Sequence, residues 1–184
     1  MRTLLSRRTR TKTRLQYEAL ECGAASLATI LDYFGRYEDL SDLRAACGVN
    51  RDGSSAGQIL KAARTYGMTA KGFRMDAKNL KEGGKYPCIV FWGFNHFLVV
   101  EGFQGDTVYL SDPAQGRYKV DFEEFSKNSE NEQISSSDLR FIEEESAASC
   151  EKSYEHDRSM RNRYPAYTRA VRIVLLDFTL TSLR

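Results

Sequence analysis

The sequence predicts an α+β fold, with helices in the first part of the chain and an antiparallel sheet in the second. Before residue 67, apolar residues recur at spacings of three and four, which is the pattern of one buried helix face. After residue 67, short runs of β-branched and aromatic residues alternate with turns that contain glycine, as in antiparallel strands. The 184 residues give room for one domain with a hydrophobic core.

Three helices are expected, each of which begins at a small or polar residue and ends at a glycine. The first begins at Cys22, and its apolar face consists of Ala24, Leu27, Ala28, Leu31 and Phe34. The second is capped by Ser41 and the third by Ser54 or Ser55, since serine side chains accept hydrogen bonds from a helix's first N–H groups. The glycines that supply a left-handed stop are Gly35, Gly48 and Gly67.

Five strands are expected in the second part of the chain. They cover residues 69–75, 88–92, 96–103, 107–110 and 117–120. A tight turn at 93–95 separates the second strand from the third.

Cys22 is the first candidate functional residue because it opens a helix. Unpaired N–H groups and the helix dipole at that end favour a thiolate over a thiol, and a protonated histidine beside it would favour the thiolate further. The alternative is a small, buried and unreactive cysteine.

Three further residues complete a set that can act together. His96 lies between two apolar strands, whereas His156, the other histidine, lies in a polar segment. Asp112, before Pro113, can orient a histidine, and the amide of Gln16 can donate a hydrogen bond to an oxyanion. Taken singly, His96 can equally be a core histidine that pairs with a backbone carbonyl, and Asp112 a turn former.

Two segments resemble the motifs of the C39 peptidase family. Residues 15–30, with Gln16 and the run Cys22-Gly23-Ala24-Ala25-Ser26-Leu27, resemble its cysteine box. Residues 96–103, followed by Asp112-Pro113-Ala114-Gln115-Gly116, resemble its histidine box. Residues 46–54 and 91–97 resemble the branch that serves nitrile-hydratase-leader microcin systems. The resemblance covers roughly residues 12 to 127.

The resemblance implies a papain-like fold and a cysteine endopeptidase. In that family Cys22 would be the nucleophile, His96 the base and acid, Asp112 the orienting group and Gln16 the oxyanion donor. The substrate would be a bacteriocin or microcin precursor, cut after a Gly-Gly or Gly-Ala site. The membrane and ATPase domains of an ABC transporter would be partners, at the cytoplasmic face of the bacterial plasma membrane.

Two other functions remain open from the sequence. The domain can be a peptidase-like module that binds leader peptides for a transporter without cutting them. It can also be an acyltransferase or a transglutaminase-like enzyme, because the same fold and residues serve that chemistry.

Composition points away from several other classes of protein. A net charge of +2 disfavours a dedicated nucleic-acid binder. Four cysteines without a C-x-x-C pair, with only two histidines, give no zinc-ligand spacing, and no phosphate-binding glycine loop is present. We therefore expect neither a metal nor another cofactor. The last apolar run, 171–178, is far shorter than the ~20 residues that span a bilayer.

The two ends of the chain are expected to differ from the peptidase domain at 12–127. Residues 1–11 form a basic arm, expected to be solvated, since six of the first fourteen residues are Arg or Lys. Residues 128–184 contain none of the 13 glycines and show little periodicity. This tail is expected to be either a divergent or disordered linker or the product of a reading-frame shift. On that basis, truncation near Lys127 is expected to cost no stability.

Overall fold

The computed structural model describes residues 8–93, 96–130 and 173–180. A short 3-10 helix, η1 (Ala19–Glu21), leads into α1 (Cys22–Tyr33). Two more helices follow, α2 (Leu40–Ala46) and α3 (Ala56–Thr65). The rest of the described chain is β1 (Met68–Met75), α4 (Ala77–Gly83), β2 (Cys88–Trp92), β3 (His96–Gln104), β4 (Thr107–Asp112), β5 (Gly116–Asp121), α5 (Phe122–Glu130) and β6 (Ile173–Leu180). The α+β prediction is therefore confirmed.

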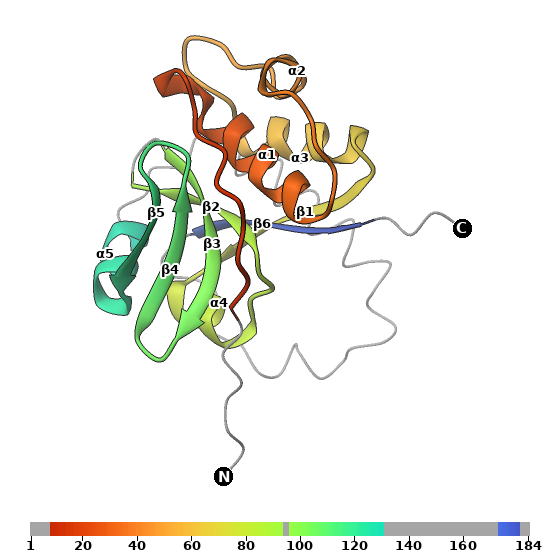
Figure 1. The fold of residues 1–184 in the computed structure, drawn as a ribbon. Helices are drawn as coiled ribbons and strands as arrows, with labels where there is room; N and C mark the ends of the chain where they lie inside the picture. The colour runs from red at the N-terminus through yellow and green to blue at the C-terminus, as the bar shows by residue number, and fades with distance from the viewer. Residues whose placement is uncertain (1–7, 94–95, 131–172, 181–184) are drawn as a thin grey trace.

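The six strands form one sheet in the order β1-β6-β2-β3-β4-β5, and every neighbouring pair is antiparallel. Helices α1, α2 and α3 cover one face, and α4 and α5 lie on the other (Figure 1). Side chains of β2 and β3 alternate between the two cores, as the period of two in a strand requires. Ile89 and Val99 join the core under α1, whereas Val90 and Leu98 join the core under α5.

Most of the helix boundaries follow the expected signals. Ser55 caps α3 and accepts a hydrogen bond from the N–H of Gln58, and Gly35 follows α1 with a φ of 79°. The predicted cap at Ser41 is wrong, because α2 begins at Leu40 and its N-cap is Asp39. Sequence analysis also missed α4, although Asp76 caps it by accepting a hydrogen bond from the N–H of Asn79.

The N-terminal segment is part of the fold from Arg8 onward. Arg8 pairs with Gly102 of β3, and the N–H of Thr9 donates to the carbonyl of Glu101. Thr11 is buried, with 4% of its surface exposed. The solvated arm expected for 1–11 is therefore corrected for residues 8–11, and residues 1–7 lie outside the described residues.

Strand β6 lies inside the sheet, between β1 and β2. All eight of its residues are in register with β1, from Met68 opposite Leu180 to Met75 opposite Ile173, and it also pairs with β2 at Ile89 and Val90. For residues 173–180 this differs from the expectation that the whole tail stands apart from the fold. Residues 131–172 and 181–184 lie outside the described residues, and the origin of the tail stays a hypothesis.

None of the helices in the described part of the chain has the length and hydrophobicity of a membrane-spanning segment.

We expect the loss of β6 to destabilise the domain, in contrast to the expectation from sequence alone. Truncation after Glu130 keeps α5 but leaves the N–H and C=O groups of β1 and β2 without the strand that joins them. The thermal unfolding midpoint should fall by several degrees relative to a chain that ends at Leu180. Equal midpoints would instead support the hypothesis that the tail is foreign to the fold.

Candidate active site

Cys22 is the first residue of α1, and this helix is buried along most of its length. Its residues from Cys22 to Leu31 are all buried, and Cys22 itself keeps 6% of its surface exposed. The hydroxyl of Ser26, one turn further on, donates a hydrogen bond of 3.1 Å to the carbonyl of Phe97 in β3. This bond links the helix that carries Cys22 to the strand that carries His96.

Gly23 allows α3 to lie close against the start of α1. A Cβ atom at this position would come within 2.8 Å of Cδ1 of Ile59 and 3.3 Å of Cβ of Ser54. Close packing against Ile59 therefore requires a glycine at position 23. This packing helps to fix the end of α1 that carries the thiol of Cys22.

His96 and Asp112 lie on neighbouring strands and form a close pair. Nε2 of His96 is 2.8 Å from Oδ1 of Asp112, and the two side chains are 22% and 2% exposed. Asp112 is the last residue of β4, and its Oδ1 also accepts a hydrogen bond of 2.7 Å from the N–H of Ala114. Asp112 is thus a buried, oriented carboxylate as well as the start of a turn.

The histidine lies between the carboxylate and the thiol. Burial lowers the pKa of His96, but hydrogen bonds to Asp112 and Cys22 and the charges of both groups raise it, and the net result is a rise from 6.5 to about 9. Because Nε2 faces Asp112, Nδ1 is the ring nitrogen that remains for Cys22. Of the set predicted from sequence, His96 and Asp112 are therefore in direct contact, and Cys22 lies close enough to His96 to raise its pKa.

Asp112 stays ionised despite its burial. Burial raises its pKa, but the hydrogen bonds from His96 and the N–H of Ala114 lower it, so that the net shift is downward. Tyr118 on β5 contacts the same carboxylate, and burial, followed by the charges of Asp112 and Glu124, raises the pKa of Tyr118 to about 12. Sequence reasoning missed Tyr118, because a tyrosine in a strand carries no signal of its partner.

Gln16 approaches the site from the N-terminal segment. Its backbone N–H donates a hydrogen bond of 2.9 Å to the carbonyl of Pro113, the residue after Asp112. Among the described residues, its side-chain Oε1 has no hydrogen-bond partner although the atom is buried. Gln16 therefore lies beside the His96–Asp112 pair with an amide that the protein itself does not fully use.

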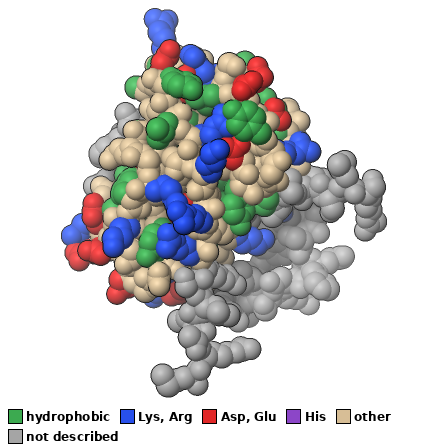
Figure 2. Space-filling model, in the orientation of Figure 1, with side chains coloured by type: hydrophobic (Ala, Val, Ile, Leu, Met, Phe, Trp, Pro, Cys, Tyr) green, Lys and Arg blue, Asp and Glu red, His purple; other side chains and the backbone are tan. Residues whose placement is uncertain are grey.

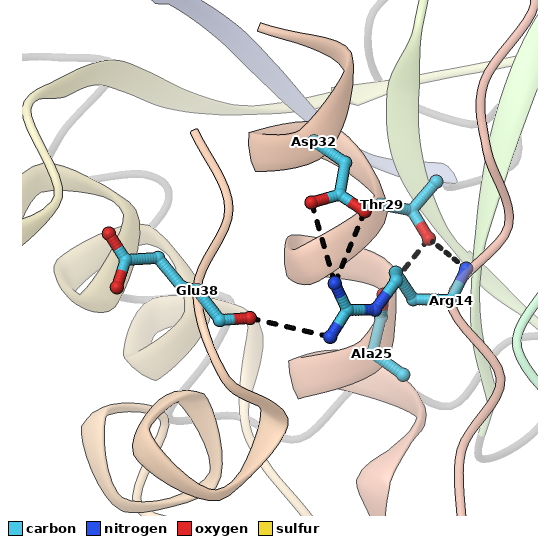
Figure 3. Close-up of polar contacts among 5 residues, drawn as sticks. All are labelled: Arg14, Ala25, Thr29, Asp32 and Glu38. Atoms are coloured by element: carbon cyan, nitrogen blue, oxygen red, sulfur yellow. Dashed lines mark hydrogen bonds and ion pairs between the residues drawn. The ribbon is translucent and has the colours of Figure 1, made fainter. Parts of the chain in front are cut away.

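The segment before Gln16 is fastened to α1 through Arg14 (Figure 3). The N–H of Arg14 donates to Oγ1 of Thr29 at 3.0 Å, and its guanidinium forms an ion pair of 3.3 Å with Asp32. The second terminal nitrogen of Arg14 donates to the carbonyl of Glu38, and Thr29 in turn donates to the carbonyl of Ala25. These contacts fix where the chain enters the site.

The segment is also fastened to the sheet through a buried carboxylate. Glu101 is 1% exposed and is the extra residue of a bulge in β3. It accepts hydrogen bonds from the N–H and the hydroxyl of Thr11, at 2.7 and 2.9 Å, and pairs with Arg117 at 2.7 Å. The bulge therefore turns one side chain of β3 toward the N-terminal segment.

Large apolar side chains are exposed around Gln16. Leu15, Tyr17 and Leu20 are 57%, 88% and 40% exposed. The face of the molecule drawn in Figure 2 shows hydrophobic side chains interleaved with basic and acidic ones.

The other described cysteines are less suited than Cys22 to act as a nucleophile. Cys47 and Cys88 are both fully buried, and burial raises the pKa of Cys47 to about 12. Cys150 and His156 lie outside the described residues. Within the described part of the chain, no cluster of three or more histidine, cysteine and carboxylate side chains could hold a metal ion.

A solved structure is similar to this chain in sequence and in fold. A crystal structure of a double glycine motif protease from an AMS/PCAT transporter, in complex with the leader peptide, is 50% identical to the chain. The matched region covers 65% of this chain and 86% of the chain in that crystal structure, with a TM-score of 0.64.

Two curated relatives match over the same region. The probable microcin-H47 secretion/processing ATP-binding protein MchF of Escherichia coli is 35% identical over 112 residues, which are 61% of this chain and 16% of that protein. The probable functional amyloid protease FapD of Pseudomonas aeruginosa is 33% identical over 117 residues, 58% of this chain and 51% of that protein. The chain thus spans only part of the length of the curated relatives that it matches.

The model of the Peptidase C39 family matches residues 10–137, which include Gln16, Cys22, His96 and Asp112. Since this match covers more than half of the chain, the chain belongs to the peptidase C39 family.

Proposed function

We propose that this cysteine peptidase removes the leader peptide from bacteriocin or microcin precursors by cutting after a double-glycine-type site, Gly-Gly or Gly-Ala. The contact of His96 with both Asp112 and Cys22 carries this proposal, because an activated thiol needs that arrangement. The solved relative at 50% identity is itself a double glycine motif protease with a bound leader peptide.

In the acylation step, the thiolate of Cys22 attacks the carbonyl carbon of the second residue of the site. The side-chain amide N–H of Gln16 then donates a hydrogen bond to the oxyanion that forms. His96 gives its proton to the leaving amine, and the peptide C–N bond breaks as the thioester forms. Asp112 holds the histidine in the orientation that this transfer requires.

In the second step, water hydrolyses the thioester. His96, now neutral, takes a proton from the water as it attacks, and the thiolate of Cys22 leaves. The products are the leader with a free carboxylate and the mature peptide with a free amine.

Transporter domains are the proposed partners, and the proposed location is the cytoplasmic face of the plasma membrane. The name of the Escherichia coli relative joins processing, secretion and ATP binding in one protein, and the chain matches 16% of it. The membrane and ATPase parts of such an assembly would have to come from sequence beyond the matched region.

A module that binds leaders without cutting them is the second candidate, and the site disfavours it. Mere capture of a peptide needs neither a cysteine at a helix N-terminus nor a histidine held by a buried carboxylate. An acyltransferase would use the same residues, but would pass the acyl group to an amine instead of water.

Incubation of the chain with a precursor that carries a Gly-Gly leader, followed by mass spectrometry, tests the proposal. We expect a hydrolysed leader and a mature peptide, and Cys22→Ala should abolish both products. Cys47→Ala and Cys88→Ala are the matched controls and should retain cleavage, since their thiols are fully buried. Iodoacetamide should modify Cys22 first at neutral pH. Intact precursor that stays bound would instead support the non-cutting module.

The pH dependence of kcat/KM should report His96. Because the pKa of His96 is about 9, its proton is present at neutral pH and is lost as the pH rises through about 9, which sets the basic limb. Asp112→Asn removes the negative charge that helps to raise this pKa, so the limb should move toward lower pH and kcat should fall. His156→Ala is the control and should leave the profile unchanged. An unmoved limb in Asp112→Asn would contradict the assignment.

The same proton contributes to folding stability. Since the pKa of His96 is higher in the folded than in the unfolded chain, this contribution to the free energy of unfolding is complete below pH 6.5 and declines as the pH rises to about 9.

Gln16→Ala should lower kcat by about 10²–10³, which corresponds to roughly 2.7–4 kcal/mol of lost oxyanion stabilisation. KM should change little, because the amide interacts with a charge that develops only in the transition state. Gln16→Glu should be no faster, since a carboxylate has no donor for the oxyanion. Steady-state kinetics on a leader peptide provide the measurement, and an effect confined to KM would make Gln16 a substrate-binding residue instead.

A further inference from the structure

The residue directly before the nucleophile is a fully buried carboxylate that the mechanism above does not use. Glu21 is 0% exposed, closes η1 and lies between Gln16 and Cys22 in the sequence. A buried carboxylate is costly unless it is paired and hydrogen-bonded. Its contacts therefore indicate what it does.

Both oxygens of Glu21 are engaged, and by different elements. Oε2 accepts hydrogen bonds from the backbone N–H groups of Tyr17, at 2.8 Å, and of Glu18, at 3.1 Å. Oε1 lies 2.9 Å from Nε of Arg44 in α2 and forms an ion pair with it, although the geometry is not that of a hydrogen bond. The carboxylate of Glu21 thus joins the loop before η1 to helix α2.

These contacts restrain Gln16 on both sides. Its own N–H is bonded to the carbonyl of Pro113, and the next N–H along the chain, that of Tyr17, is bonded to Glu21. The peptide units that flank Gln16 are therefore tied to the turn after Asp112 and to the residue before Cys22.

We propose that Glu21, braced by Arg44, is a positioning residue that holds the loop from Gln16 to Cys22 so that the Gln16 amide meets the oxyanion. This inference rests on the proposed function. It predicts an effect on the transition state that passes through Gln16, and little effect on the thiol itself.

A double-mutant cycle between Glu21 and Gln16 tests this inference. Glu21→Ala should lower kcat by about 10–100-fold, less than the roughly 10²–10³ expected for Gln16→Ala, with KM within about twofold. The double variant should be about as slow as Gln16→Ala alone, because a misplaced amide and a missing amide give the same result. Arg44→Met should lower kcat in the same direction, since it removes the partner of Oε1.

Glu18→Gln is the matched control. Glu18 reaches the same Arg44, but at 3.4 Å and with a side chain that is 64% exposed, and such pairs contribute little. This variant should keep kcat near the wild-type value. Glu21→Gln, which retains an acceptor oxygen, provides a milder variant if Glu21→Ala does not fold in a thermal melt.

The rate at which iodoacetamide alkylates Cys22 separates positioning from a general structural role, because alkylation needs no oxyanion donor. This rate should stay within about threefold of wild type in Glu21→Ala. A parallel loss of alkylation, or effects of Glu21 and Gln16 that multiply in the double variant, would overturn the inference.

Hydrogen exchange provides a readout that does not depend on cleavage. The amides of Tyr17 and Glu18 should exchange faster in Glu21→Ala than in wild type, because both lose their acceptor. If the wild-type chain cuts no leader peptide, the proposed function fails while this measurement still tests the hold of Glu21 on the loop. Unchanged exchange would refute that hold directly.

Discussion

The packing of α1 against β3 is the contact on which the site depends. The helix is buried along most of its length, and the hydrogen bond from Ser26 to the carbonyl of Phe97 fixes its register against the strand. Cys22 lies one turn before Ser26, and His96 directly precedes Phe97. A buried helix cannot slide without opening cavities, so the same packing that stabilises the core also keeps the thiol beside the imidazole.

The N-terminal segment supplies a second constraint. It follows β3 from Arg8, passes the buried carboxylate of Glu101, is tied to α1 through Arg14 and ends with the bond from Gln16 to Pro113. Successive anchors of this kind let a segment without regular secondary structure place one side chain accurately. The segment is therefore as much a part of the site as the helix and the sheet are.

The buried charges of the domain follow one rule. Asp112 faces His96, Glu101 faces Arg117, and Glu21 faces Arg44, and each carboxylate also accepts backbone hydrogen bonds. Pairing of this kind is what makes burial of a carboxylate tolerable. Asp112 pairs with the candidate base His96, and Glu21 directly precedes the candidate nucleophile Cys22 in the sequence.

The sequence by itself determined the local structure and the chemical set. Apolar residues spaced by three and four after Cys22, followed by the stop at Gly35, predict α1. The short apolar runs predict β2 and β3. These signals depend only on near neighbours in the sequence. The resemblance to the family motifs then selected Gln16, Cys22, His96 and Asp112 among residues that chemistry alone left ambiguous.

Only the tertiary structure decided what depends on distant contacts. A strand from residues 173–180 enters the sheet between β1 and β2, and no local pattern gives the neighbour of a strand. Glu21 and Glu101 look like other glutamates until burial and their partners are known. Cys22 and His96 are 74 residues apart in the chain, and only the packing of helix on sheet brings them close enough for the thiol to raise the pKa of the imidazole.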